Sequence, residues 1–581
     1  MSDAKSHDDS VGEKGSDVHD NVQEINGSEI DLLEYHEHNA GRLVVDPEEA
    51  RIEFGEAVAK KLKLSKDGTK VLWPQPADDP LDPQNWSDFQ KNLQLFIVTL
   101  AAIVPDFDSG IGIASIFALA QQFDTTTGVI NNMTSNWSIF LLGKYLTFSS
   151  ESPASDSAPR LGRHLRCDAY ETIRPPTGPV LVARFLVGCT FAPNLKTFTA
   201  MRCLNGFFAT CPQVTGLYIV TDLFPFHLQA RKLNIWTMGF IISPFLSPFA
   251  FGFLVARTTW RWAYGIGSMY GAAVLILIVT LSKETLYDRK LPDPRPMPLP
   301  SNPIRARIET LIGITGVRMA KYRSTWKEVT FIWFELIWRP HLLAILCFEG
   351  VLFGFSIGIN VTNAVFLQLP IPLGYQFGQF ATAGAYATPI VAVLIGETLG
   401  RYLNDYIMNV SIRRNKGVFE AESRLWTCYL AVSLYIIGFV VLGASFQNHL
   451  SVGALVMGWG IAEVATMVNT VAVYAYVNDC FPRLQGEISA LVNLFRTLGG
   501  FAVAYFQVIW ATKNGAIQTF GCEAAIVTGL FILIVPALQL TGRTLRVRSA
   551  SELGQATTNI EFNIELNTET LLVVVGDVAE V

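Results

Sequence analysis

Long apolar runs alternate with short polar stretches along most of this chain. A helix needs about 20 mostly apolar residues to cross the hydrocarbon core of a bilayer. Ten runs reach that length, at residues 93–118, 197–221, 233–256, 260–281, 341–367, 379–396, 425–445, 452–476, 488–511 and 519–541. Two weaker runs, 136–148 and 180–192, are each nearer a dozen residues and too short to cross unaided. The pattern predicts an all-α polytopic membrane protein with a nominal twelve spans, the second and third being disrupted.

A long polar segment separates six runs from six. It predicts five regions: an acidic N-terminal tail (1–90), an N-terminal six-helix bundle (91–282), a central loop (283–340), a C-terminal six-helix bundle (341–541) and a C-terminal tail (542–581). The net charge of −6 comes from the ends of the chain, since residues 1–70 hold 17 acidic against 9 basic side chains. Acidic, weakly apolar ends of this kind are typical of solvated tails.

Composition excludes a soluble globular protein. Half of the 581 residues are hydrophobic and 16% are charged, whereas about a quarter are charged in soluble domains. The 8 Cys form no CxxC pair, and the chain has no HExxH, G-x-S-x-G or P-loop string. We therefore expect no enzyme activity, no cofactor, no metal site and no nucleic-acid partner. The expected partners are the lipid bilayer, a small-molecule substrate and protons, and the expected state is a monomer.

Basic residues give the expected orientation. The segments 119–135, 368–378 and 446–451 hold no Lys or Arg. The connections on the other side are basic, with Lys and Arg at positions 160, 163, 166, 231, 232, 401, 413, 414, 416, 483, 543, 546 and 548. By the positive-inside rule both termini and the central loop are cytoplasmic. The sequons at Asn132 and Asn136 then lie outside, where they predict a glycoprotein.

Three strings mark the ends of spans. They are DPQNWS at 82–87, before the first span, KETLYDR at 283–289, after the sixth, and NDCFP at 478–482, after the tenth. In this order and spacing they resemble the fungal, drug:proton-antiporter-like branch of the major facilitator superfamily, over about residues 73–548. The resemblance implies two six-helix bundles and secondary active transport of small organic molecules, with both termini inside, in the plasma membrane of a fungus.

Further strings resemble motifs of that superfamily. Arg202 to Gly206 in the fourth span resembles the RxxxG motif linked to proton coupling. The fifth span keeps the small and Pro residues of the antiporter motif without its usual glycines. The gating-loop motif has a half-repeat after the eighth span and a degenerate first copy after the second, in which Pro159 replaces the acid. Its matching residues are Arg160, Gly162, Arg163, Gly400, Arg401 and Asp405.

Charged side chains within spans are costly and usually functional. Five of them fall on the first, fourth, seventh and tenth spans, the helices that line the central cavity in facilitators: Asp106, Asp108, Arg202, Glu349 and Glu463. A carboxylate in a low-dielectric cavity can hold a proton near neutral pH and release it when water or a cation arrives. We predict that Asp106 and Arg202 couple protons to transport; a static buried ion pair is the alternative. For Arg496 we predict a structural role.

Polar side chains on the same spans are candidates for substrate contact. They are Asn205, Gln213, Tyr218, Asn360, Asn363, Asn469 and Tyr474; hydrogen bonding between helices is their alternative role. Two kinds of transport remain open. One is proton-driven efflux, by antiport, of drug-like compounds or secondary metabolites. The other is proton-coupled uptake of organic cations such as polyamines. The acidic cavity favours cationic cargo in both. A membrane enzyme or receptor is a distant third.

Residues 144–180 do not fit this plan. The run carries many charged residues together with Ser and Pro, so no helix from it could lie in lipid. The flanking runs nevertheless look like the start of the second span and the end of the third. We predict a frame slip or a misplaced intron boundary in the gene sequence; a genuine deletion in a decayed gene is the alternative.

Overall fold

The computed structural model describes residues 47–54, 56–72, 75–80, 82–130, 185–209, 216, 219–283, 285, 336–371, 374–414, 420–481 and 485–545. Several predicted features lie outside these residues. They are the tails 1–46 and 546–581, the run 144–180, most of the central loop, and the positions Asn132, Asn136, Arg160, Gly162, Arg163, Gln213 and Tyr218. Expectations for them stay predictions.

Among the described residues, nine helices are long and apolar enough to cross a membrane. They are α4 (Asp88–Ala114), α12 (Phe226–Val255), α13 (Trp260–Leu281), α17 (Pro340–Gln368), α18 (Gln379–Ala385) with α19 (Ala387–Arg414), α20 (Thr427–Asn448), α21 (Val452–Cys480), α22 (Gln485–Asn514) and the helix Ala516–Leu545. Each coincides with a predicted run, which confirms an all-α, multi-pass membrane fold.

Of the three remaining predicted spans, 136–148 lies outside the described residues, and 180–192 and 197–221 are partly described. α10 (Leu195–Ala209) covers the first part of the run 197–221. Residues 185–190, within the weak run 180–192, are helical. The short elements are α2 (Pro47–Phe54), α3 (Glu56–Ala59), η1 (Pro83–Asn85), α5 (Ile116–Gln122), α6 (Thr127–Ile130) and η4 (Ala421–Trp426).

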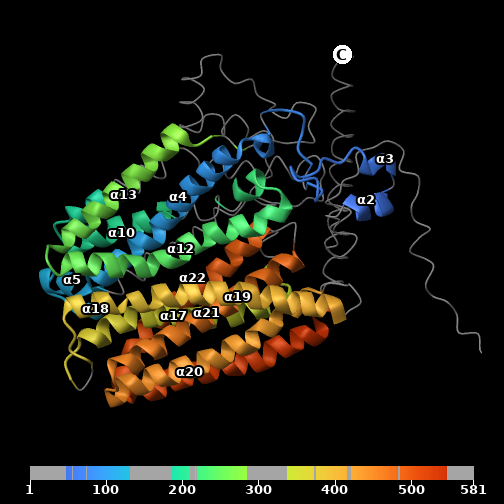
Figure 1. Ribbon diagram of the computed structural model, residues 1–581. Coiled ribbons are helices and arrows are strands. Elements are labelled where there is room, and N and C mark those ends of the chain that lie inside the picture. The colour runs from blue at the N-terminus through green and yellow to red at the C-terminus, as the bar shows by residue number, and fades with distance from the viewer. Residues whose placement is uncertain are drawn as a thin grey trace, which may run out of the picture. The chain divides into compact units, whose positions relative to one another are not determined.

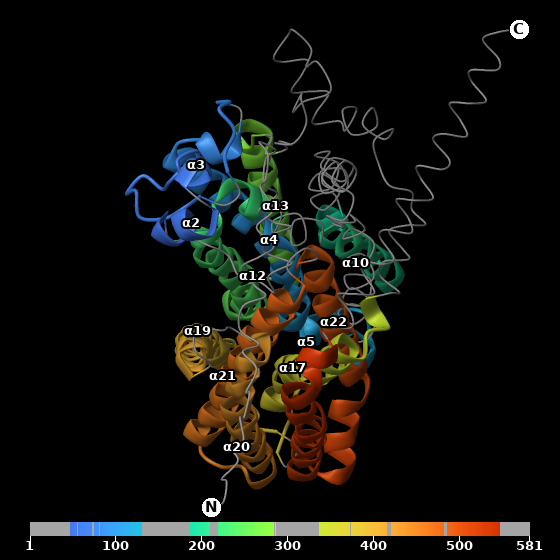
Figure 2. The same ribbon diagram turned by 90° about the vertical axis from the view of Figure 1, so that its right-hand side faces the viewer.

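The long helices form two groups. In Figure 1 and Figure 2, α4, α10, α12 and α13 lie together, and α17, α19, α20, α21 and α22 form the second group. Aromatic side chains fill the first core, where the Phe198 ring meets Trp260 and Tyr264 edge-on at 5.5 and 5.3 Å between ring centroids. In the second core Tyr435 stacks on Phe439 at 4.0 Å. Large rings of this kind bury much apolar surface and pack with defined geometry.

Small residues bring α17 and α22 into backbone contact. A Cβ atom on Gly354 would lie 2.6 Å from the carbonyl carbon of Gly499, and one on Gly350 would lie 2.9 Å from the carbonyl oxygen of Phe495. Membrane helices associate through such close approach, because lipid supplies no hydrophobic drive for helices to meet. The register of α17 on α22 is therefore set by glycines.

The DPQNWS string at 82–87 folds into a hydrogen-bonded loop at the start of α4. Asp82 accepts hydrogen bonds from the backbone N–H groups of Ala77, at 2.8 Å, and of Gln84, at 2.9 Å. The buried Lys91 donates to the carbonyl of Gln84 at 2.8 Å. Ser87 caps the helix by accepting from the N–H of Gln90. The string thus fixes where the first span begins.

At the opposite end of α4 the two groups touch. Gln379 of α18 donates to the carbonyl of Ala114 at 2.9 Å. The guanidinium of Arg257, just beyond α12, lies 5.4 Å from the Phe380 ring centroid. A Cβ atom on Gly252 of α12 would lie 2.7 Å from that of Ala383. The helix ends that meet here are those for which the charge pattern predicts the extracellular side.

Candidate functional site

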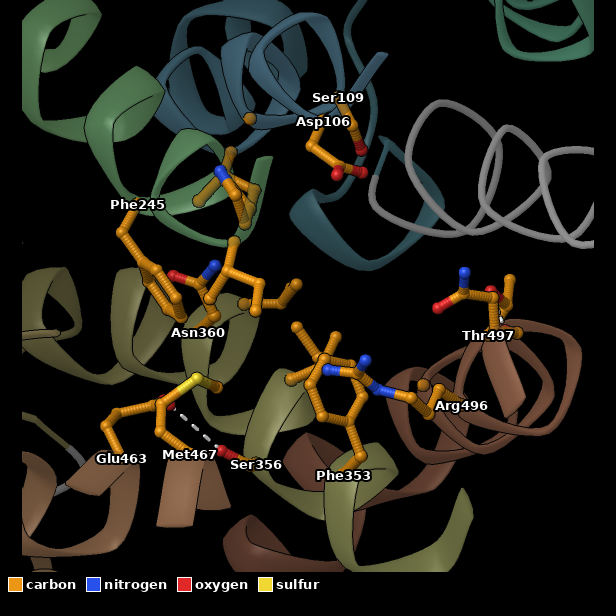
Figure 3. A pocket seen from close by; sticks show the side chains of 18 residues that line it. Asp106, Ser109, Phe245, Phe353, Ser356, Asn360, Glu463, Met467, Arg496 and Thr497 are labelled. Carbon is orange, nitrogen blue, oxygen red and sulfur yellow. Dashed lines mark hydrogen bonds between the residues drawn. The ribbon is translucent and has the colours of Figure 1, made fainter. Parts of the chain in front are cut away.

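A cavity of about 130 Å³ lies among five helices, α4 and α12 from the first group and α17, α21 and α22 from the second. Its lining is Asp106, Ser109, Gly110, Ile113, Ile241, Pro244, Phe245, Phe353, Ser356, Ile357, Asn360, Val361, Glu463, Met467, Asn493, Arg496, Thr497 and Gly500. Most of the accessible surface of this lining is apolar, and eight polar or charged side chains converge on it (Figure 3). A small-molecule site has this composition.

Charges of both signs reach the cavity. Asp106 extends from α4 and Arg496 from α22, on different sides of the space drawn in Figure 3. Pro105 precedes Asp106 within α4 and supplies no backbone N–H, so it interrupts the helical ladder at this point. Pro244 does the same in α12, the helix packed beside α4. Local departures from regular helix therefore accompany the polar lining.

Glu463 of α21 is buried, with two donors on its carboxylate. The Ser356 hydroxyl donates to Oε2 at 3.2 Å, and the Trp459 indole donates to Oε1 at 3.4 Å. Trp459 lies one helical turn earlier on α21, so the sequence itself places this donor. Two neutral donors thus hold the carboxylate where α21 lines the cavity.

Glu349 of α17 is fully buried next to Arg496, outside the lining of the cavity. Its two oxygens accept hydrogen bonds from the Asn469 amide, at 2.8 Å, and the Thr470 hydroxyl, at 2.9 Å. Oε1 also lies 3.7 Å from Nε of Arg496. Three helices, α17, α21 and α22, therefore meet through one buried ion pair, which no single stretch of sequence could reveal.

Arg202 belongs to a second buried cluster. It donates to the carbonyl of Asp108 at 2.7 Å and to that of Ser109 at 3.3 Å, and it lies 5.6 Å from the Tyr264 ring centroid. Asn205, one turn along α10, is 3.5 Å from the Asp108 carboxylate. The RxxxG segment of α10 therefore packs against the turn of α4 that also carries Asp106.

The predicted site residues thus divide into two sets. Asp106, Asn360 and Glu463 line the cavity. Six others are buried outside its lining: Asp108, Arg202, Asn205, Glu349, Asn363 and Asn469. Tyr474 is half-buried, and the gating-motif residues Gly400, Arg401 and Asp405 lie on α19, also outside the lining. Arg202 donates to the carbonyls of Asp108 and Ser109, on the turn of α4 that carries Asp106. Asn469 donates to Glu349, which lies within ion-pair range of Arg496.

The described half of the gating motif forms an ionic bridge. Gly400 of α19 packs on α21, where a Cβ atom would lie 3.1 Å from Cα of Val468. Arg424 of η4 lies between two carboxylates, at 3.8 Å from Asp405 and 2.9 Å from Asp479. Asp479 comes from the NDCFP string after the tenth predicted span. Two motifs far apart in sequence are thus joined through a third segment.

Several cavity residues were not among the predicted candidates. Arg496 was assigned a structural role, and its contact with Glu349 fits that role; it also lines the cavity, as do Ser109, Ser356, Asn493 and Thr497. A further buried chain links Thr362, Gln507 and Glu523, with hydrogen bonds of 2.7 to 3.1 Å. The signal for Glu523 was present, because it is an ionisable residue within an apolar run, like Glu349.

The structure is that of a polytopic α-helical membrane protein with a cavity among helices of both groups. The family model described as Major Facilitator Superfamily matches residues 176–504, more than half of the chain. The chain belongs to this superfamily, as its motifs indicated. The match begins near the end of the charged run 144–180.

Relatives agree with this assignment. The chain is 24% identical over 561 residues to an uncharacterized MFS-type transporter, C1271.10c, of Schizosaccharomyces pombe, covering 85% of this chain and 91% of the relative. It is 22% identical to the efflux pump radE of Floropilus chiversii, over 92% and 95% of the two chains. In structure it resembles the xylose transporter XylE from E. coli, with a TM-score of 0.50, 13% identity, and coverage of 76% and 96%.

Proposed function

We propose that this protein is a proton-coupled exporter of drug-like compounds or secondary metabolites. The observation that carries the proposal is the mainly apolar cavity between the two helix groups, into which Asp106 of α4 projects. Similarity to a relative named as an efflux pump supports the outward direction. An apolar body can bind against Ile241, Phe245 and Met467, while the carboxylate alternates between proton and cargo.

Coupling follows from the position of Asp106. A carboxylate among apolar side chains is costly to keep charged, so a proton or a polar cargo group stabilises the site in turn. Arg202 acts on this step through α4, because it donates to the carbonyls of Asp108 and Ser109 on the turn that carries Asp106. Arg202 is in this account a positioning residue. Uptake of organic cations remains the second candidate, since Asp106 could equally bind a cation on its way in.

The proposal includes an orientation. Both termini face the cytoplasm of the cell, the contacts of Gln379 with Ala114 lie on the outer side, and the membrane is the plasma membrane. A protein with its outer helix ends in contact opens its cavity to the cytoplasm, which is the side from which an exporter loads.

Transport measurements in cells test the proposal. Cells lacking their own exporters are loaded with labelled candidate compounds, and efflux is followed with and without a protonophore. The full chain should speed efflux, and the protonophore should abolish that gain. Cells that carry Asp106→Asn should show the same slow efflux as cells without the protein. The matched control is Asp124→Asn, an exposed acid at the outer end of the same group, which should export normally. Protonophore-resistant efflux, or full efflux by Asp106→Asn, would rule out the proposed coupling.

A further inference from the structure

We propose that Arg496 makes this cavity a binding site for the anionic group of an otherwise apolar cargo, such as a carboxylic acid or an acidic enol. The inference deepens the proposed function and rests on it. It also changes the expected charge of the cargo. The acidic residues in the sequence favour a cation, whereas Arg496 in the cavity favours an anionic group.

Arg496 is a buried cation whose guanidinium has N–H donors available to a ligand. Its side chain is 6% exposed, and it lines the cavity. Nε has no hydrogen-bond partner among the described residues. A guanidinium carries five N–H donors in a planar fork that matches a carboxylate. Nε faces the buried Glu349, so a ligand oxygen in the cavity would be met by the terminal N–H groups, which extend toward the middle of the lining residues (Figure 3).

Phe353 and Tyr474 orient the guanidinium, and the Tyr474 hydroxyl accepts a hydrogen bond from one of its N–H groups. Its carbon lies 3.4 Å from the centroid of the Phe353 ring and 5.7 Å from that of Tyr474. Aromatic faces hold a guanidinium by its flat side and leave its edge available. In Figure 3 the group extends from α22 over Phe353 toward the middle of the lining residues. Its edge can therefore meet a bound molecule.

Glu349 balances Arg496 only in part. At 3.7 Å from Nε its carboxylate is within ion-pair range but beyond a hydrogen bond. Both Glu349 oxygens are already engaged by Asn469 and Thr470. An anionic ligand group would therefore gain a charge-assisted hydrogen bond that Glu349 does not make, and would compete with Glu349 for the same positive charge.

Two other carboxylates line the cavity and could oppose an anion. Asp106 stands on α4, separated from Arg496 by the open part of the site, and Glu463 is held by Ser356 and Trp459 on the floor. Apolar residues such as Ile113, Ile357 and Val361 lie among these groups. The cargo that fits has one acidic end at α22 and an apolar remainder.

The test compares two probes of one shape and different charge, 2-naphthoate and methyl 2-naphthoate. The purified full chain in lipid nanodiscs is titrated with each, and binding is read from tryptophan fluorescence. The variants are Glu349→Gln, which leaves Arg496 without its counter-charge, and the double variant Arg496→Gln with Glu349→Gln. The double variant is neutral, so it leaves no uncompensated charge in the membrane.

The two variants should move the acid in opposite directions. Wild type should prefer the acid to the ester, and Glu349→Gln should increase that preference. In the double variant the Kd of the acid should be about tenfold higher than in wild type, which is a loss of about 1.4 kcal/mol in binding free energy. The Kd of the ester should stay within about twofold of the wild-type value. A purely structural ion pair predicts instead that acid and ester weaken together in both variants, which would overturn the inference.

Other outcomes are also decisive. If Glu349→Gln does not fold, the acid-to-ester ratio of wild type against the double variant decides alone; equal ratios overturn the inference. If the double variant does not fold, Glu349→Gln must raise acid binding for the inference to stand. Failure of the proposed function gives a different result. Efflux would then not depend on protons, while the ratio of acid to ester affinity in the binding test would stay as predicted.

Discussion

Gly354 lies where α17 and α22 are in backbone contact, next to the cavity residue Phe353. A Cβ atom at this position would be 2.6 Å from the carbonyl carbon and 2.8 Å from Cα of Gly499. Carbon atoms at optimal separation are about 3.5–4.0 Å apart. The atoms in the way are backbone, so no side-chain rotation relieves the clash. In Gly354→Ala the two helices must therefore separate by roughly 1 Å.

The expected cost follows from two opposing effects. Overpacking a well-packed core costs about 1–3 kcal/mol, and a backbone clash belongs at the upper end. Replacing Gly by Ala within a helix stabilises the helix by about 1 kcal/mol. The net loss is about 1–2 kcal/mol, or about 2–8 °C in melting temperature for a unit of this size. Phe353 on α17 and Arg496 on α22 would move apart with the helices, so ligand binding should weaken too.

The assay is thermal unfolding of the full chain in detergent, read as the surviving monodisperse fraction by size-exclusion chromatography. The matched control is Gly529→Ala in the helix Ala516–Leu545, where an added Cβ meets nothing within 4 Å. That variant should melt at or slightly above the wild-type temperature. Equal melting of Gly354→Ala and Gly529→Ala would show that α17 and α22 are not held by glycine contact.

Three further predictions test other parts of the account. Gln507→Leu should destabilise the protein by about 1–3 kcal/mol, because the buried Glu523 loses its donor, and the double variant that also replaces Glu523 with Leu should recover most of the loss in the same melting assay. Epitope tags at residues 20 and 560 should be detected only in permeabilised cells; labelling of intact cells would reverse the orientation. Sequencing the transcript across 144–180 should give two full apolar spans with a DRxGR-like loop, whereas a transcript that encodes the run unchanged in a transporting strain would refute the frame slip.

The apolar pattern was sufficient to locate the described spans. Nine predicted runs coincide with described helices because a span is a local property, set by about 20 residues of one segment. Caps are local as well, and Ser87 begins α4 where the DPQNWS string ends. The helix pairing of α17 with α22 is different. It depends on Gly354 and Gly499 meeting across 145 positions of the chain, and the sequence gives no register for that contact.

The site was predictable only by residue type. Ionisable residues in spans singled out Asp106 and Glu463 as candidates for proton coupling, and both line the cavity; the coupling role stays a prediction. The joint role of Arg202 and Asp106 in coupling stays a prediction. The sequence could not show that Arg202 donates to the carbonyls of Asp108 and Ser109, because helical rotation sets which side of α4 faces α10. Arg496 could not be placed in the cavity from sequence, since its position there depends on the packing of α22 against α17.

Proton flux through the purified protein tests the central claim most directly. The full chain is reconstituted in proteoliposomes that contain a pH-sensitive dye, a pH gradient is imposed, and cargo is added on one side. With wild type the cargo should speed the dissipation of the gradient, and with Asp106→Asn it should not, although both proteins insert equally. Cargo movement with no accompanying proton movement, or unchanged proton flux in Asp106→Asn, would contradict the account.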